Sequence, residues 1–340
     1  MSGPSSKSTG CCAPRQAFSM CRRFRWKFGG RMRGVLDYVF TRPVSTMALD
    51  RGRYGIMCHN DGGIVCDGVV FRLAKDRFWY VHADRDVFTW LQALKPGYNV
   101  EIRDPGAWAI QIQGPTSLEI LDACVDGGAP EGFKYYHARQ VTMGDQPVLI
   151  SRTGWTAELG FEVYNMEPNV DGMALWSHLM AAGNPHGMEI LSTYAMNPRR
   201  IEAGIMNYGT DMDWGTTPFD LGLEGFVDFD HDFVGRDALR VSERAPRFSG
   251  FMTEAKDIKW GSPVLENGKE VGHVKAFEQS PTLGIGVGYV LFDTPEAMTA
   301  NTLTVKGREG NKHSLTLHAL PFFDVDKNIP RGIEIVEFKK

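Results

Sequence analysis

"RTGWTAELGFEVY", residues 152–164, reads as a strand, a turn containing two glycines, and a second strand. Within the second strand, Glu162 stands among Phe161, Val163 and Tyr164, residue types that are enriched in buried sheet. A carboxylate buried there without hydrogen-bond donors would cost free energy. Either the protein or a bound ligand must therefore supply donors to Glu162.

The composition of the chain limits the class of protein. It has 340 residues, 43% of them hydrophobic, and a formal net charge of −4, which allows two or three domains with large cores. No run of about 18 apolar residues occurs, so no membrane span is predicted. The negative charge argues against a nucleic-acid-binding protein. Cys58, Cys66 and Cys124 follow neither a zinc nor a redox spacing, and we expect reduced thiols in a cytoplasmic protein.

The first 33 residues differ in composition from the rest of the chain. They contain eight Lys or Arg residues and no Asp or Glu, together with three of the six cysteines. Such a segment is typical of a targeting peptide, a basic tail or a sequence foreign to the fold. It lacks an apolar h-region, so a secretory signal is not expected. We interpret residues 1–33 as an atypical, disordered basic segment.

Hydrophobic periodicity predicts the elements of the remaining chain. Residues 54–83 indicate three strands separated by turns. Helices are expected at 84–94, with Asp84 as N-cap, and from Asn197, with that residue as N-cap. Strands and helices are interspersed without a regular βαβ alternation, so residues 34–245 are predicted to be α+β. Short strands with glycine turns predict a small β-barrel over residues 246–340.

Isolated carboxylates in apolar or glycine-rich surroundings are the candidate functional groups, because the chain contains no phosphate-binding, HExxH or nucleophile-elbow motif. For each of them the alternative is a turn residue or an ion pair. Strand alternation puts Asp67 on one face with Val65 and Val69, where it would be functional if that face lines a cavity. The nine histidines form no ligand cluster, and we predict no metal. The carboxylates are Asp67, Glu162, Glu202 and Asp211.

Several motifs, in order along the chain, resemble those of the aminomethyltransferase family, which includes the glycine-cleavage T-protein. Residues 152–164 are similar to its R-T-G-Y-T-G-E-x-G-[FV]-E-[IV] motif. "RRIEAGIMNYGTDMDWGTTP" (199–218) is similar to its L-R-L-E-A-G-x-x-x-Y-G-x-D-x-x-x-x-T-T-P motif, and "GGIVCDGVVFRL" (62–73) to its G-G-[IV]-x-D-D motif. The resemblance, over roughly residues 34–340, implies a three-lobed fold of mixed sheets and helices, a central tetrahydrofolate channel, and one-carbon (methyl or aminomethyl) transfer.

The resemblance also implies roles for single residues. A pterin ring presents an amino group and a ring N–H side by side, and Glu162 is implied to accept both. Asp67 matches the second acid of the family's D-D pair and is implied to be catalytic. It would orient the folate amine and stabilise developing positive charge, or act as general base. Arg200, Tyr208 and Trp155 are predicted to bind the cofactor.

Alternative roles stay open for Arg200 and for the aromatic candidates. For Arg200 the alternative is an ion pair with Glu202 or Glu158. The aromatic candidates could hold a cationic methyl group by cation–π attraction, and the alternative is core packing. These aromatic residues are Trp155, Tyr208 and Trp214.

The chain departs from the family pattern at three places. Cys66 stands where the family has the first acid of its pair, and Val81-His82-Ala83 stands where it has S-N-A. The family's opening L-W-D and I-x-G-x-D-A motifs are absent, and residues 1–33 look unrelated to that opening.

Two stretches resemble the folate-dependent demethylase branch, dimethylsulfoniopropionate demethylase most of all: "LAKDRFWYVHADRDVFTW" (73–90) and "LPFFDVDKNIPRG" (320–332). We therefore predict a tetrahydrofolate-dependent demethylase that acts on a small methylated donor. The alternative is aminomethyltransferase of the glycine cleavage system, with a lipoyl carrier protein as partner. A folate-binding protein of the iron–sulfur assembly type would carry K-G-C-[YF]-x-G-Q-E where this chain has DFVGRDAL (232–239). The detached half of a flavin-dependent sarcosine or dimethylglycine dehydrogenase is the remaining alternative.

Overall fold

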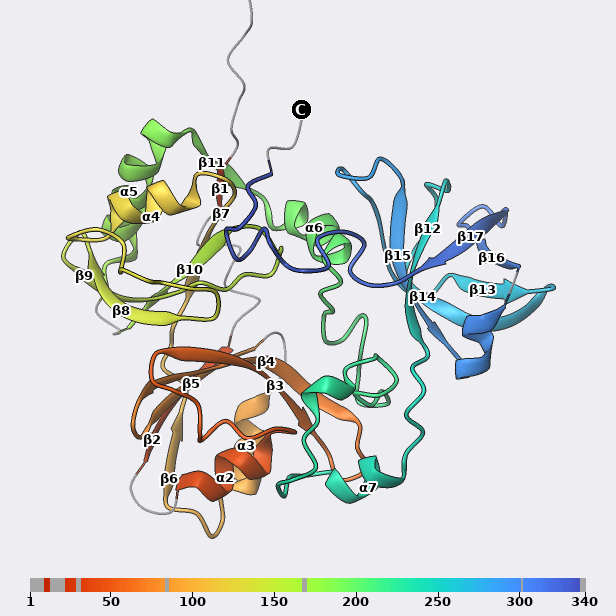
Figure 1. Ribbon diagram of the computed structural model, residues 1–340, viewed down its shortest axis with the longest axis horizontal. Coiled ribbons are helices and arrows are strands. Elements are labelled where there is room, and N and C mark those ends of the chain that lie inside the picture. Colours follow the sequence, from red (N-terminus) through yellow and green to blue (C-terminus); the bar gives the residue numbers. More distant parts are fainter. Residues whose placement is uncertain are drawn as a thin grey trace, which may run out of the picture.

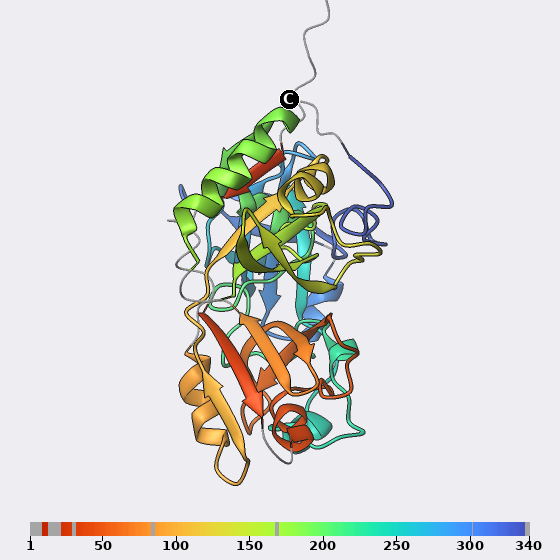
Figure 2. The ribbon, with the colours of Figure 1, turned by 90° about the vertical axis from the view of Figure 1, so that its left-hand side faces the viewer.

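Three lobes make up the protein (Figure 1): two β-sheets covered by helices, and a closed six-stranded barrel. The α+β fold class with a C-terminal barrel is therefore confirmed. Seen from the side (Figure 2), the yellow and green sheet lobe stands above the orange first lobe. The computed structural model describes residues 9–12, 22–28, 32–82, 86–166, 170–300 and 302–336.

The elements of the first lobe are β2 (Arg22–Phe28), α2 (Met32–Val39), β3 (Arg51–Cys58), β4 (Ile64–Ala74), β5 (Arg77–His82), α3 (Val87–Leu94) and β6 (Val100–Arg103). Its sheet is antiparallel, in the order β3-β4-β5-β2-β6. The predicted run of three strands is confirmed as β3, β4 and β5. Helices α2 and α3 bury Leu36 and Leu91 against sheet residues such as Val70 and Tyr80, because both helices are apolar on the side facing the sheet.

The N-cap of α3 differs from the one predicted. The Asp86 side chain caps the helix, accepting a hydrogen bond from the backbone N–H of Thr89 at 3.1 Å. Asp84 lies outside the described residues. Both aspartates satisfy the sequence rule for a cap, and the register of the first turn decides between them.

The elements of the second lobe are β1 (Thr9–Cys12), β7 (Ala109–Gln113), α4 (Ser117–Cys124), β8 (Ala138–Met143), β9 (Gln146–Ser151), β10 (Gly160–Asn165), α5 (Gly172–Gly183), η1 (Asn184–His186) and β11 (Met188–Leu191). The sheet order is β11-β1-β7-β10-β9-β8, with β1 parallel to β11 and the other pairs antiparallel. Phe161 and Val163 of β10 pack under α4 and α5. Tyr164 packs on the opposite face, against Phe71 and Trp79 of the first lobe, and strand alternation gives Glu162 that same side.

Residues 1–33 contribute strands to both sheets. Strand β1 lies between β11 and β7, and β2 lies between β5 and β6. The residues of these two strands are therefore ordered, contrary to the prediction of a disordered segment. That prediction relied on composition, and an internal strand can carry basic residues. The remaining residues up to 31 lie outside the described part of the chain.

The elements of the barrel are β12 (Phe248–Thr253), β13 (Pro263–Glu266), β14 (Lys269–Gln279), β15 (Gly286–Phe292), η4 (Pro295–Thr299), β16 (Leu303–Lys306) and β17 (Lys312–His318). They close in the order β12-β15-β14-β13-β16-β17 around a core that includes Phe251, Val274 and Val290. Asn267 and Gly268, both at positive φ, form the tight turn between β13 and β14. The predicted barrel is confirmed, while its boundaries at 246 and 340 stay a prediction.

The segments between lobes contain η2 (Thr193–Ala195), α6 (Met196–Glu202), η3 (Glu224–Phe226) and α7 (Arg236–Val241). Helix α6 has Ala195 as N-cap, so the predicted N-cap Asn197 lies inside the first turn. After β17 the chain runs back from the barrel toward the second lobe (Figure 1), and the N–H of Phe322 donates to the carbonyl of Glu202 at 2.9 Å. Among the described residues, no helix has both the length and the apolar character needed to span a bilayer.

Removing residues 1–28 tests whether β1 and β2 belong to the fold. We expect the melting temperature to fall by more than about 5 °C, because the deletion leaves the facing edges of both sheets without hydrogen-bond partners. Calorimetry on the shortened chain measures this fall, with a chain lacking only residues 1–8 as control. An unchanged melting temperature would show that β1 and β2 do not stabilise the fold.

Candidate functional site

A cavity of about 1190 Å³ lies where the three lobes meet. Carboxylates, aromatic rings and cations from distant parts of the chain line it, so residues 50–80 come together with residues 150–210 and 319–327. Among the lining residues are Tyr54, Asp67 and His82 of the first lobe, Gln111, Thr153, Trp155 and Glu162 of the second lobe, residues 203–208 after α6, and Ala319, Leu320, Pro321 and Lys327 after the barrel.

Asp67 lies on β4, opposite Ile56 of β3, and faces this cavity. The Tyr54 hydroxyl donates to its Oδ2 at 2.9 Å, and no cation pairs with it among the described residues. Burial raises the pKa of Asp67 to about 6, while the bond from Tyr54 works in the opposite direction. A carboxylate with this pKa is ionised at neutral pH and can still be protonated within the physiological range.

Strand alternation explains why Asp67 reaches the cavity. Val69 also lines the cavity, whereas Cys66 and Val70 pack in the core of the first lobe. Val65 was predicted on the face of Asp67, but it packs in the core with Cys66. The register of β3 against β4 shifts between Met57 and Cys58, and this irregularity breaks the alternation at that end of the strand.

Glu162 lies on β10, between Gln111 of β7 and Ser151 of β9. The Thr153 hydroxyl donates to its Oε2 at 2.6 Å, and that hydroxyl also shares a 2.6 Å hydrogen bond with Ser151. Within the described part of the chain, Glu162 has no ion pair and Thr153 is its side-chain donor. A hydroxyl satisfies one lone pair of a carboxylate and leaves the charge uncompensated, so Glu162 can accept donors from a ligand in the cavity.

Two of the predicted aromatic residues line the cavity and one does not. Trp155 and Tyr208 form part of the wall, and Trp155 also stacks over the guanidinium of Arg200 at 5.2 Å. Trp214 is absent from the wall; its ring stacks on His59, with centroids 4.3 Å apart. Trp214 therefore lies neither in the cavity wall nor in the core, because it is 45% exposed, and sequence alone could not separate it from the other two.

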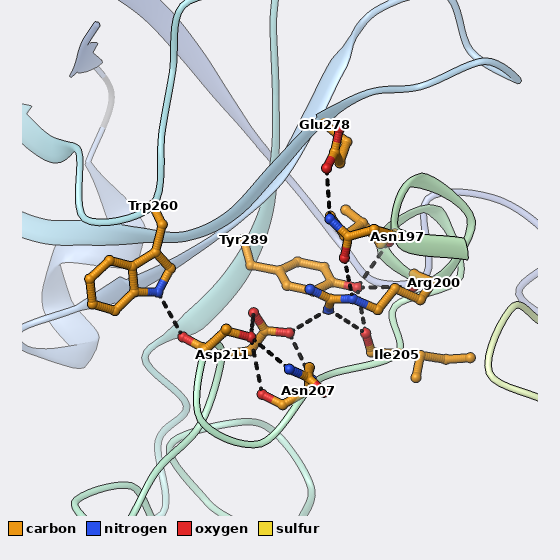
Figure 3. Close-up of polar contacts among 10 residues, drawn as sticks. Asn197, Arg200, Ile205, Asn207, Asp211, Trp260, Glu278 and Tyr289 are labelled. Atoms are coloured by element: carbon orange, nitrogen blue, oxygen red, sulfur yellow. Dashed lines mark hydrogen bonds and ion pairs between the residues drawn. The ribbon is translucent and has the colours of Figure 1, made fainter. Parts of the chain in front are cut away.

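Arg200 does not line the cavity, which corrects the predicted direct contact with a cofactor. It is buried in an ion pair with Asp211, whose Oδ2 lies 2.5 Å from its Nη1 (Figure 3). The alternative partners Glu158 and Glu202 pair instead with the neighbouring Arg199. Adjacent helical residues point about 100° apart, so the two arginines of α6 reach different acids.

Sequence reasoning missed the hydroxyl donors to the two acids, and it missed a set of cations. Thr153 stands inside the quoted motif, but its closeness to Glu162 depends on the pairing of β9 with β10. Tyr54 reaches Asp67 through the pairing of β3 with β4. His82 of β5 packs on Tyr80 and also lines the cavity. The lining cations are Arg42, Arg51, Arg53 and Lys327.

The arrangement suits a large, partly planar ligand that carries N–H donors at one part and negative charge at another. Both carboxylates offer lone pairs to N–H donors, aromatic rings provide flat walls, and four cations offset negative charge. The acceptors, aromatic rings and cations of these residues therefore fit the N–H donors, flat ring and negative charge of a reduced pterin cofactor. No group of three or more His, Cys, Asp or Glu side chains in the described residues is arranged to hold a metal ion.

Comparison with protein families gives two adjoining matches. Residues 25–231 match the GCVT N-terminal domain, and residues 247–324 match the glycine cleavage T-protein C-terminal barrel domain. The chain belongs to the glycine cleavage T-protein family. Members of this family are folate-dependent one-carbon transferases, and the prediction of such an enzyme is confirmed. The first match begins inside β2, so the family domain includes part of the basic segment.

Individual relatives carry the name aminomethyltransferase. One from Clostridium botulinum (strain Loch Maree / Type A3) is 32% identical over 287 residues, which cover 81% of this chain and 76% of the relative. One from Streptomyces avermitilis is 33% identical over 303 residues, covering 85% and 81%. The crystal structure of glycine cleavage system aminomethyltransferase T from Bartonella henselae shares the fold, with a TM-score of 0.82 at 22% identity over 94% of this chain and 88% of that one. These relatives support the alternative reading, aminomethyl transfer, and leave the demethylase branch unconfirmed.

Replacing Asp67 by Asn tests whether the protein leaves the negative charge of Asp67 uncompensated. The folded state holds the Asp67 proton more tightly than the unfolded chain does, so ionisation opposes folding as the pH rises through about 6. Asp67→Asn should therefore raise the melting temperature at pH 7.5 by roughly 2–5 °C, and by less at pH 5. The control is Asp61→Asn, whose side chain is 95% exposed. A lower melting temperature for Asp67→Asn at pH 7.5 would mean that the carboxylate is compensated within the protein.

Proposed function

We propose that this protein is an aminomethyltransferase. It passes the one-carbon unit of a carrier-bound aminomethyl group to tetrahydrofolate, with release of ammonia and of the carrier in its dithiol form. The observation that carries the proposal is that Asp67 and Glu162 face one cavity, each with one hydroxyl-bearing side chain as its donor among the described residues. The names of the relatives support aminomethyl transfer as the reaction.

Glu162 is the residue that would hold the pterin ring. The Thr153 hydroxyl fixes Oε2 of its carboxylate, and the chain of hydrogen bonds through Ser151 orients that hydroxyl. A pterin offers two adjacent N–H donors, which is the pattern that a carboxylate accepts in a bidentate manner. Charge-assisted hydrogen bonds of this kind would fix the orientation of the ligand and supply part of its affinity.

Asp67 is the residue that would act on charge during transfer. When bound, tetrahydrofolate supplies the amine nitrogens that accept the one-carbon unit. The half-buried Asp67 carboxylate would stabilise positive charge that develops near it, and limited solvent exposure would strengthen this effect. The Tyr54 hydroxyl holds Oδ2 in place. Because the pKa of Asp67 is about 6, the carboxylate is also a suitable acceptor for an amine proton.

The other walls suit the rest of the ligand. Trp155 and Tyr208 present aromatic surface, which excludes water from the transfer site. Arg42, Arg53 and Lys327 give the lining positive charge, which complements the carboxylates that folates carry. A lipoyl carrier protein would be the partner in this reaction, and it would deliver the aminomethyl group to the same cavity.

Demethylation of a small methylated donor is the second candidate. Both stretches that resemble the demethylase branch, 73–90 and 320–332, reach the cavity through His82 and Lys327. An aromatic wall that includes Trp155 would also suit a sulfonium methyl group through cation–π attraction.

A comparison of donors tests which reaction occurs. With tetrahydrofolate and an aminomethyl-loaded lipoyl carrier, we expect ammonia and methylenetetrahydrofolate in equal amounts. Dimethylsulfoniopropionate and related methyl donors should give no methyltetrahydrofolate. The Asp67→Asn variant serves as control and should lose about 100-fold in rate. Methyltetrahydrofolate formed from a methyl donor, without ammonia release from the carrier, would overturn the proposal in favour of demethylation.

The Glu162→Gln variant tests the pterin contact. Loss of the charge-assisted acceptor should weaken tetrahydrofolate binding by about tenfold, measured by anaerobic titration calorimetry. Glu158→Gln is the matched control, because Glu158 pairs with Arg199 and is absent from the cavity wall. Equal affinity of Glu162→Gln and the unaltered protein would show that Glu162 is a structural residue.

A further inference from the structure

One continuous strip of the cavity wall follows helix α6. All six residues from Ala203 to Tyr208 line the cavity, although they form neither a helix nor a strand. A wall made of loop must be held by something other than a regular hydrogen-bond ladder. The contacts that hold this strip therefore also determine the shape of the ligand site.

The guanidinium of Arg200 holds the start of the strip. Its Nη1 donates to the carbonyl of Ile205 at 3.1 Å as well as to Asp211. The N–H of Ile205 donates back to the carbonyl of Arg200 at 2.9 Å. Arg200 and Ile205 are thus tied by their backbones and by a side chain.

Asp211 holds the end of the strip. Its Oδ2 accepts from the N–H of Asn207 at 2.8 Å in addition to Arg200, and its Oδ1 accepts from the Thr210 hydroxyl at 3.1 Å. Figure 3 shows these bonds converging on the Asp211 carboxylate. The position of Asn207, and of the adjoining Tyr208, therefore depends on the same carboxylate that neutralises Arg200.

Arg200 also joins the strip to the rest of the molecule. One face of its guanidinium meets the Trp155 ring of the cavity wall at 5.2 Å, and the Tyr289 ring of the barrel lies 6.0 Å away. Its Nε donates to Asn197 at 2.7 Å, and Asn197 donates to Glu278 of the barrel at 2.7 Å. These contacts connect the second lobe and the barrel through one side chain.

A direct contact between Arg200 and a ligand does not fit this arrangement. The side chain is 4% exposed, that of Asp211 is 0% exposed, and neither residue lines the cavity. The N–H groups described above are committed to Asp211, Ile205 and Asn197. Removing one member of such a buried pair leaves the other charge without compensation, so the pair should respond as a unit.

We propose that Arg200 and Asp211 are positioning residues of the ligand site: their buried ion pair fixes Asn207 and Tyr208 in the cavity wall and supports the Trp155 ring from outside the cavity. The identity of the ligand, tetrahydrofolate, rests on the proposed function. The position of residues 203–208 does not rest on it, and it can be measured without any ligand.

The first test uses the ligand-free protein. In Asp211→Asn, hydrogen–deuterium exchange at residues 203–208 should become about tenfold faster or more, because Asn207 loses its carboxylate acceptor and Arg200, which holds Ile205, loses its ion-pair partner. Glu202→Gln is the matched control: it also disturbs a buried ion pair of α6, with Arg199, but neither residue of that pair lines the cavity. Unchanged exchange of this strip in Asp211→Asn would overturn the proposal whatever the ligand is.

The second test measures tetrahydrofolate affinity in a double-mutant cycle of Arg200→Lys and Asp211→Asn. Each variant should weaken binding by about tenfold, and the double variant should lie within about twofold of either, because one pair is broken in all three. Glu202→Gln should keep the affinity of the unaltered protein. Losses that multiply, with Arg200→Lys much the larger, would overturn the proposal in favour of a direct contact. Absence of binding by the unaltered protein would contradict the proposed function, and the exchange experiment would still decide the positioning role.

Discussion

The rest of the site depends on one constraint: two half-buried carboxylates are held by hydroxyl groups rather than by cations. The Tyr54 and Thr153 hydroxyls each satisfy one oxygen and leave the negative charge in place. A guanidinium partner would remove that charge, as Arg200 does for Asp211. Burial raises the pKa of Asp67 because no such partner is present among the described residues. Under the proposed function, this uncompensated charge is what would favour a ligand with N–H donors.

Each lobe contributes something that the others lack. The first lobe supplies Asp67 from a strand, the second supplies Glu162 from another, and both strands are rigid because their opposite faces pack in separate cores. The loop after α6 and the segment after the barrel complete the wall. Strands thus carry the two carboxylates, while irregular segments, held by contacts such as those of Arg200 and Asp211, complete the wall.

The sequence allowed prediction of the features that depend on local periodicity. The apolar surroundings of Asp67 and Glu162 in their strands identified both as acids in need of donors, and glycine turns identified the barrel. The family motifs supplied the three-lobed arrangement and the cofactor. Strand alternation also gave one wrong prediction. Val65 was expected on the face of Asp67, but a register shift beside it turns its side chain to the core. The two boundaries at 33 and 246 were inferred from composition, which does not report strand pairing.

Features that depend on tertiary contacts could not be predicted. Arg199 and Arg200 are neighbours with equal access to acids in the sequence, and only the packing of α6 against the barrel decides their partners. Trp155 and Trp214 look alike in their motifs, yet one borders the cavity and the other stacks on His59. The hydroxyl donors to the acids come from strand neighbours, whose identity requires the sheet register.

The placement of the first two strands has a consequence for biosynthesis. Strand β1 is complete when 12 residues have been made, but its partner β11 ends at Leu191. Strand β2 likewise waits for β6, which ends at Arg103. A ribosome therefore synthesises more than half of the polypeptide before the second sheet can close, although β2 and β1 each gain one partner earlier, when β5 and β7 have been made. The four basic residues of β2 would discourage premature association with other nascent chains until β6 has been made.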